Sequence, residues 1–427
     1  MKLFQQMLVA TASLGLIAPI AAQASDVINL EGMNDYNRSK KSSSKRFDSK
    51  TFVNEVNEDL ATLKGRVDGL EAKQNNFEAG SFSDTTTMDG KAIFTVQSVD
   101  TDDNVAESYH GQVHAAYTYQ LNLNTSFNGD DNLYVRLKSG NHDGPSDIKS
   151  VYNTYLSSGS GKSDAMTVDK IWYTLPVGER NTVFLGPKVE NYYMHGTTPS
   201  IYKPVLKSFT LGGNAAAYGA DTSPGAGWKY EADNGFAISS NFTTQDGNTS
   251  SGMLTNEGPT SWATQVGYTQ PRYSVSAIVN MKYNDWTDSY FQSTAGKGRG
   301  GDGNSTNIGL RGWWRPESTG TATPSISAGY DTSETDNTGA NTNTTAYFVG
   351  LNWQDIFNAD DRIGIAIGQP QKLENDTVDP FLYEIYYSYR VNDSTTITPA
   401  FFGGTSKNSA NKEVDMTGFV VETHFNF

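Results

Sequence analysis

The chain contains no cysteine among its 427 residues. A disulfide framework, a cysteine-ligated zinc or iron–sulfur centre and a thiol nucleophile are therefore excluded. Cations are also scarce, because 32 lysine and arginine residues stand against 47 aspartate and glutamate residues, for a net charge of −15. Nucleic-acid binding requires clustered cations that displace phosphate counterions, so a general nucleic-acid binder is excluded too. Aromatic residues make up 12% of the chain, which is too many for a disordered protein.

Long apolar runs are almost absent, and the one that exists lies at the N-terminus. Lys2 precedes an apolar stretch from Met7 to Ile20, and Ala22-Gln23-Ala24 follows as a small-x-small cleavage site. This pattern predicts a signal peptide over residues 1–24 that is removed on export. A retained membrane anchor is the alternative, but the apolar run is shorter than the ~20 residues that a membrane-spanning helix requires. The exported protein is therefore either soluble or a membrane protein built from strands.

Residues 25–50 are polar and rich in serine and basic side chains. The basic residues are Arg38, Lys40, Lys41, Lys45 and Arg46. Such a composition cannot bury enough apolar surface to order itself, which favours a solvated linker. The alternative is an electrostatic contact with an anionic cell-wall polymer such as peptidoglycan.

A heptad pattern follows over residues 51–79. Apolar residues recur at alternating spacings of three and four, at Val53, Val56, Leu60, Leu63, Val67 and Leu70. This spacing predicts a coiled-coil helix that needs a partner helix. A single amphipathic helix lying on its own domain is the alternative, and Gly65 and Gly69 weaken any isolated helix.

From about residue 91 onward the hydrophobic period is two, which only strands show. Val275, Ala277 and Val279 alternate with Ser274, Ser276 and Asn280, for example. About sixteen such segments occur, and short connections such as Gln270-Pro271 contrast with long polar stretches such as 140–164. Short turns at one end and long loops at the other are typical of transmembrane barrels, whose backbone polar groups must all pair. We therefore predict an all-β fold, with a closed antiparallel transmembrane β-barrel over residues 85–427.

The final strand separates this barrel from its rival, a secreted or surface β-rich adhesin. Aromatic and apolar side chains share one face of this strand, at Phe419, Val421, Phe425 and Phe427. A last amphipathic strand ending in phenylalanine resembles the signal read by the outer-membrane barrel assembly machinery. The pattern favours the cell outer membrane, with lipid around the wall.

Several ordered motifs resemble the cyanobacterial outer-membrane porins related to the carbohydrate-selective OprB-type family. They are Leu63-Lys64-Gly65-Arg66-Val67-Asp68-Gly69-Leu70-Glu71, Leu310-Arg311-Gly312-Trp313-Trp314-Arg315-Pro316, Asn352-Trp353-Gln354-Asp355 and Gly364-Ile365-Ala366-Ile367-Gly368-Gln369-Pro370. The resemblance covers roughly residues 52–427 and implies a homotrimeric channel with a periplasmic coiled coil. Members often carry a cell-wall-binding domain ahead of the coiled coil, and residues 25–51 are too few for one.

Enzymatic and cofactor motifs are weak. Residues 298–303 match G-x-G-x-x-G, but no helical pattern follows to hold a pyrophosphate. The five histidines show no metal-ligand spacing. We predict no enzyme activity, no cofactor and no metal site, and an outer-membrane hydrolase barrel is the one enzymatic alternative that spacing leaves open.

Residues on the polar face of each predicted strand are taken to face the lumen, which identifies candidate pore-lining residues. They are Arg136, Lys138, Lys170, Lys229, Lys282, Arg311 and Arg390, against Glu231, Glu384 and Glu422. Charges along a narrow water-filled pore select solutes by sign. We predict passive diffusion of small hydrophilic solutes and inorganic ions, with anions favoured. The alternative is that loop carboxylates neutralise these cations and leave little selectivity.

A long stretch without clean alternation, residues 191–222, predicts a loop that folds into the pore. Its candidate constriction residues are Tyr193, His195, Tyr202, Lys203 and Lys207. An ordinary surface loop is the alternative.

Overall fold

The computed structural model describes most of the barrel-forming part of the chain. The described residues are Lys64, Val67 and residues 85–102, 111–143, 155–219, 221–286, 303–336, 343–374, 376–408 and 412–427. The chain divides into two units, Met1–Ala72 and Lys73–Phe427. The predicted signal peptide and linker lie outside the described residues. Of the predicted coiled-coil segment only Lys64 and Val67 are described, and both are helical.

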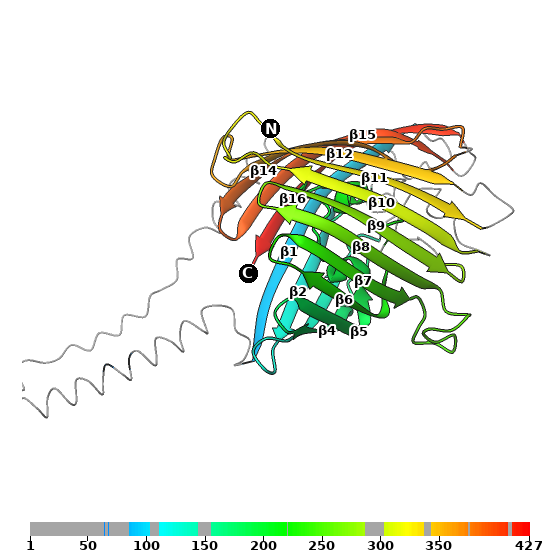
Figure 1. The fold of residues 1–427 in the computed structure, drawn as a ribbon. Helices are drawn as coiled ribbons and strands as arrows, with labels where there is room; N and C mark the ends of the chain where they lie inside the picture. Colours follow the sequence, from blue (N-terminus) through cyan, green and yellow to red (C-terminus); the bar gives the residue numbers. More distant parts are fainter. Residues whose placement is uncertain are drawn as a thin grey trace, which may run out of the picture. The chain divides into compact units, whose positions relative to one another are not determined.

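Sixteen antiparallel strands form one closed barrel in the described part of the chain. Figure 1 shows the strands lying side by side around this barrel. Each strand pairs with its neighbours in sequence, and β1 pairs with β16 to close the ring. The strands are β1 (Thr86–Thr101), β2 (His114–Thr125), β3 (Asn132–Gly140), β4 (Thr167–Val177), β5 (Asn181–Glu190), β6 (Thr222–Glu231), β7 (Phe236–Thr244), β8 (Thr260–Gln270), β9 (Tyr273–Tyr283), β10 (Ser305–Trp314), β11 (Ser325–Thr335), β12 (Thr344–Gln354), β13 (Arg362–Leu373), β14 (Phe381–Asn392), β15 (Thr395–Lys407) and β16 (Glu413–Asn426). The predicted barrel of about sixteen strands is confirmed.

The wall is apolar outside and polar inside, the reverse of a soluble protein. In β9 the exposed positions include Val275 and Val279, whereas Ser274, Asn280 and Lys282 are buried. Side chains of a strand alternate between its two faces, so one parity faces outward and the other inward. An outer face of this kind suits hydrocarbon, and a polar inner face suits water.

The two ends of the barrel differ in the length of their connections. At one end β8 and β9 are joined by Pro271 and Arg272, and β14 and β15 by Asp393 and Ser394. At the other end the connections include residues 141–166 and 191–221. Among the described residues, no helix has the length and apolarity to cross a bilayer.

Two connections at the short-turn end, after β2 and after β12, share the pattern Phe-Asn-x-Asp-Asp. The last carboxylate closes each turn. The Asp131 carboxylate accepts hydrogen bonds from the Tyr173 hydroxyl at 2.6 Å and from the backbone N–H groups of Phe127 and Asn128 at 2.8 and 3.0 Å. Asp361 accepts three backbone N–H groups at 2.9–3.0 Å and a tyrosine hydroxyl.

These bonds change the pKa of both turn carboxyls. The hydrogen bond from Tyr173 is the largest cause that lowers the pKa of Asp131. Burial raises the pKa of Asp361, but its backbone N–H bonds outweigh burial and lower the pKa overall. A lowered folded-state pKa contributes stability above the unfolded pKa, and this contribution is lost as pH falls.

The seam between β1 and β16 is closed by an aromatic contact. Phe427 and Gly90 exchange two backbone hydrogen bonds of 2.7 and 3.0 Å. A Cβ atom on Gly90 lies 2.5 Å from the Phe427 ring, so only glycine leaves room for that ring. The ring also stacks on Tyr119 with the centroids 6.0 Å apart. The role of Phe427 in assembly stays a prediction.

Replacing Gly90 with alanine is expected to displace the Phe427 ring and destabilise the seam. The cost is about 1 kcal/mol, at the lower end of overpacking in a core, because the Phe427 ring is 57% exposed and can shift. The measurement is the heat-induced mobility shift of the folded barrel in detergent, which should occur at a lower temperature. Gly312→Ala is the matched control, because its Cβ meets no atom closer than 3.6 Å. An equal shift in both variants contradicts the claim that Gly90 leaves the space in which the Phe427 ring packs.

Candidate functional site

The connection between β5 and β6 enters the barrel. We call its residues 191–219 the lumen loop, which includes η3 (Asn191–Met194) and η4 (Lys207–Gly212). Glu384 of β14, on the inner wall, accepts the Tyr202 hydroxyl at 2.8 Å and the Leu206 N–H at 2.7 Å. The Val205 N–H lies 3.2 Å from the same carboxylate. The lumen loop is therefore tied to the wall on the far side from the strands that carry it.

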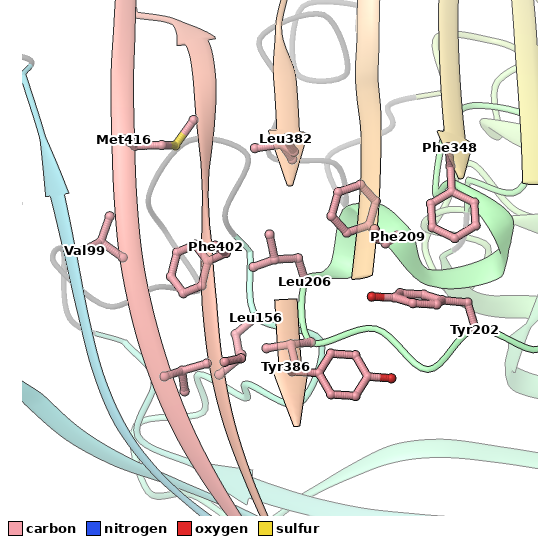
Figure 2. Packing of buried hydrophobic residues seen from close by; sticks show 14 residues of the cluster. Val99, Leu156, Tyr202, Leu206, Phe209, Phe348, Leu382, Tyr386, Phe402 and Met416 are labelled. Atoms are coloured by element: carbon pink, nitrogen blue, oxygen red, sulfur yellow. The ribbon is translucent and has the colours of Figure 1, made fainter. Parts of the chain in front are cut away.

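Apolar packing fixes the same part of the lumen loop, as Figure 2 shows. Tyr202, Leu206 and Phe209 are at most 4% exposed. They pack against inward-facing side chains of β12, β14, β15 and β16, including Phe348 and Phe402. A barrel wall facing only water has no reason to place phenylalanines inward, so these residues mark the sector that the loop fills.

Arg311 of β10 holds the part of the lumen loop that follows Phe209. Its guanidinium donates to the carbonyls of Leu211 at 2.8 Å and Gly213 at 2.7 Å, and it pairs with Asp331 at 2.6 Å. The Arg311 side chain is 0% exposed. Arg311 thus differs from the sequence expectation, because it faces inward but meets the lumen loop instead of water.

A second inward segment was not foreseen from the sequence. Part of the connection between β3 and β4 lies against the lumen loop, with Ser157 N–H bonded to Val205 O at 2.8 Å and Lys207 N–H to Tyr155 O at 2.7 Å. Leu156 is fully buried in the same apolar cluster. One sequence signal is the pair of large apolar residues Tyr155 and Leu156 inside a mostly polar stretch. We call residues 155–162 and the lumen loop together the plug.

A cavity of about 490 Å³ remains between the plug and the wall from β1 to β6. Its walls carry six cations and two acids: Lys91, Arg136, Lys138, Lys162, Lys170 and Lys207, with Asp169 and Glu190. With each side chain counted in its usual charged form, the formal lining charge is six minus two, or +4. We call this space the basic cavity. A cationic lining of this density contrasts with the acidic chain as a whole.

Arg136 is positioned mainly by neutral oxygens. Its Nε donates to the Tyr134 hydroxyl at 2.8 Å and to Asn122 Oδ1 at 3.2 Å, and its Nη2 donates to the Tyr193 hydroxyl at 3.0 Å. The nearest acid, Asp169, lies 3.9 Å from Nη1. The positive charge of Arg136 is therefore held in place with little direct compensation.

The positive charge of Lys170 is compensated more directly than that of Arg136. It forms a buried ion pair with Glu190, and both side chains are at most 5% exposed. Its Nζ also lies 4.9 Å from the centroid of the Tyr193 ring and 5.5 Å from that of Tyr192. Cation–π contacts of this kind hold an ammonium group beside aromatic faces.

The structure distributes the predicted pore-lining residues over three places. Arg136, Lys138 and Lys170 line the basic cavity. Three others face inward but are buried, at 4% exposure or less, and these are Lys282, Arg311 and Glu384. The remaining two are ion-paired near the short-turn end: Lys229 with Glu231, and Arg390 with Asp360 and Asp393.

The predicted constriction residues are also divided. Tyr193 and Lys207 line the basic cavity. Tyr202 is buried in the plug, and His195 is buried beside Tyr218 at a ring distance of 5.6 Å. Lys203 is exposed, and its backbone N–H bonds Asn352 Oδ1 at 3.2 Å.

Two cavity cations, Lys91 and Lys162, were missing from the candidate pore-lining residues. Lys91 lies on the same face of β1 as the buried residues Ile93 and Thr95, so strand alternation could have identified it as inward-facing. Lys162 lies in the inward part of the β3–β4 connection, where the sequence has no strand alternation that could assign the side chain to the inside of the barrel. Strand parity therefore finds wall residues but not the cations that a folded-in connection supplies.

The family model described as "Carbohydrate-selective porin, OprB family" matches residues 48–425. Among solved structures, Pseudomonas putida OprB is similar at 12% identity and a TM-score of 0.57, covering 80% of this chain and 94% of that chain. OmpT of Vibrio cholerae in its trimer form is similar at 14% identity and a TM-score of 0.50, covering 81% of this chain and 100% of that one. These likenesses show a porin fold.

Two curated relatives are uncharacterised cyanobacterial proteins. One, from Nostoc sp., is 32% identical over 174 residues, which is 38% of this chain and 28% of the relative. The other, from Synechocystis sp., is 28% identical over 137 residues, which is 32% of this chain and 25% of the relative. The matched stretch thus spans only about a quarter of each relative.

Proposed function

The chain belongs to the OprB family of carbohydrate-selective porins, and on that premise we propose that it admits small hydrophilic solutes and inorganic ions by passive diffusion, with anions favoured. It is an outer-membrane porin, a channel rather than an enzyme. The proposal concerns the solutes and the sign of the selectivity. The observation that carries it is the +4 lining of the basic cavity.

Electrostatics explains why a cavity of this kind favours anions. Protein and lipid around a narrow aqueous space have a low dielectric constant, so the field of the wall charges is focused into the water. The plug concentrates this effect, because it fills the sector beside β12 to β16 and leaves the basic cavity beside β1 to β6. Anions are therefore concentrated in the cavity, and cations are depleted from it.

Neutral sugars are expected to pass as well, since an electrostatic field does not exclude them. Tyr192 and Tyr193 offer aromatic faces at the cavity. Their rings stack with centroids 4.9 Å apart, so part of that aromatic surface is already covered.

The assembly of the porin is a further part of the proposal. The heptad pattern over residues 51–79 supports a periplasmic coiled coil. The trimer form of the similar OmpT of Vibrio cholerae supports a homotrimer. The basic residues of segment 25–50 support a contact with an anionic cell-wall polymer. The apolar outer face of the barrel supports contact with outer-membrane lipid, and the strand with Phe419, Val421, Phe425 and Phe427 supports recognition by the barrel assembly machinery.

Reconstitution of the detergent-extracted protein into planar bilayers tests the transport proposal. We expect stepwise conductance increments, and swelling of liposomes in small neutral solutes. A protein that stays in the aqueous fraction without detergent and gives no conductance steps supports the adhesin alternative instead.

A further inference from the structure

The cations of the basic cavity converge on one space. They come from four separate elements: β1, β3, β4 and the plug. Lys91, Arg136 and Lys138 stand on the wall, and Lys162 and Lys207 approach from the plug. An anion in the cavity is therefore surrounded by positive charge from several directions, which is the arrangement of a binding site rather than of a charged surface.

The wall side of this arrangement is preorganised. Arg136 is fixed by three hydrogen bonds to neutral oxygens, as described above, and its side chain is only 15% exposed. Tyr193, one of its partners, is itself packed on Trp172 at a ring distance of 5.0 Å. A guanidinium that is already ordered loses little conformational freedom when it binds a ligand, which favours affinity.

The size and charge of the cavity favour a divalent oxyanion over chloride. The cavity volume of about 490 Å³ far exceeds the ~10–15 Å³ that one water needs on the same measure, so a tetrahedral oxyanion fits together with part of its hydration shell. Several oxygens of an oxyanion can each accept a charge-assisted hydrogen bond from a different lysine or arginine, and two can bind one guanidinium in parallel, which a monatomic chloride ion does not allow. A double charge also gains twice the Coulomb attraction to a +4 lining.

We propose that the basic cavity is a saturable binding site for divalent oxyanions of the phosphate and sulfate class, with Arg136 and Lys138 as wall donors. This inference rests on the proposed function, because it requires that anions reach the cavity from solution. It goes beyond that function, because simple diffusion predicts no saturation and no difference among anions of equal charge and size. Bound oxyanion occupies the space through which chloride passes, so it reduces the chloride current.

The test is inhibition of chloride current through the full-length porin in planar bilayers. Potassium sulfate or inorganic phosphate at pH 7 replaces potassium chloride on one side at constant ionic strength, and glucose serves as a neutral addition. We expect sulfate and phosphate to reduce the unitary chloride current along a saturating curve, beyond the loss due to chloride dilution. Glucose at the same concentration should leave the current unchanged.

Variants assign the effect to the cavity. Lys138→Gln and Arg136→Gln are expected to raise the half-inhibitory concentration about tenfold or more, because each removes a charged donor. Arg180→Gln, in the exposed turn between β4 and β5, is the matched control and should leave it unchanged. If Arg136→Gln fails to fold, as judged by the heat-induced mobility shift, Lys138→Gln alone carries the test.

The outcomes separate this inference from the proposed function. A wild-type channel that prefers anions but shows only the loss from chloride dilution overturns the binding site and leaves the proposed function standing. Equal inhibition by glucose, or inhibition that neither variant changes, also overturns the site. A channel without anion preference overturns the proposed selectivity itself.

Discussion

Replacing residues 197–206 with a glycine and serine segment of equal length is expected to raise the single-channel conductance severalfold. The replaced stretch contains Tyr202, Val205 and Leu206, which hold the lumen loop against β12 to β16. Without them the Glu384 carboxylate loses the Tyr202 hydroxyl, and the apolar packing of Figure 2 is lost. The segment then no longer fills its sector of the barrel, so the aqueous cross-section grows.

The control is the same replacement in the connection between β7 and β8, at residues 247–256, a mostly exposed stretch of equal length at the same end. Its conductance should equal that of the parent. Glu384→Ala provides a second, milder variant, because it leaves buried donors without an acceptor and loosens the loop. Parent-like conductance in both plug variants contradicts the constricting role of the lumen loop.

Reversing three charges of the basic cavity is expected to invert the ion selectivity. The substitutions Lys91→Glu, Lys138→Glu and Lys207→Glu each change the charge by two, so the lining charge falls from +4 to −2. They leave the Lys170–Glu190 and Arg136–Asp169 pairs in place. In a potassium chloride gradient the reversal potential should change sign, from that of an anion-preferring channel to that of a cation-preferring one.

The matched control applies the same change in total charge outside the cavity, with Arg180→Glu, Arg272→Glu and Lys412→Glu. These three side chains are exposed in connections. None of them lines the basic cavity, and salt screens exposed charges over about 10 Å at 0.1 M, so they act on the cavity less than the charges that line it. A reversal potential that moves as far in the control as in the cavity variant contradicts the assignment of selectivity to the basic cavity.

The barrel was predictable from the sequence because each face of its wall meets one solvent. Outward residues such as Val275 and Val279 had to be apolar, and inward ones such as Asn280 had to be polar. This requirement repeats every second residue, and it is therefore visible without any knowledge of pairing. The closure of the ring followed from the need to pair every backbone group in lipid.

The fate of each inward side chain was not predictable in the same way. Arg136 and Arg311 both lie on the inward face of their strands. Arg136 lines the basic cavity, whereas Arg311 is buried under the lumen loop. Parity states which side of the wall a residue occupies. It does not state whether water or another segment lies there, because contacts such as Leu206 to Glu384 join residues that are 178 positions apart.

The reversal potential of the unmodified porin in a potassium chloride gradient tests the central claim most directly, namely that a plugged barrel with a cationic cavity favours anions. We expect a potential displaced toward the chloride equilibrium potential, smaller in magnitude at high salt because mobile ions screen the cavity charges. A potential displaced toward the potassium equilibrium potential contradicts the account.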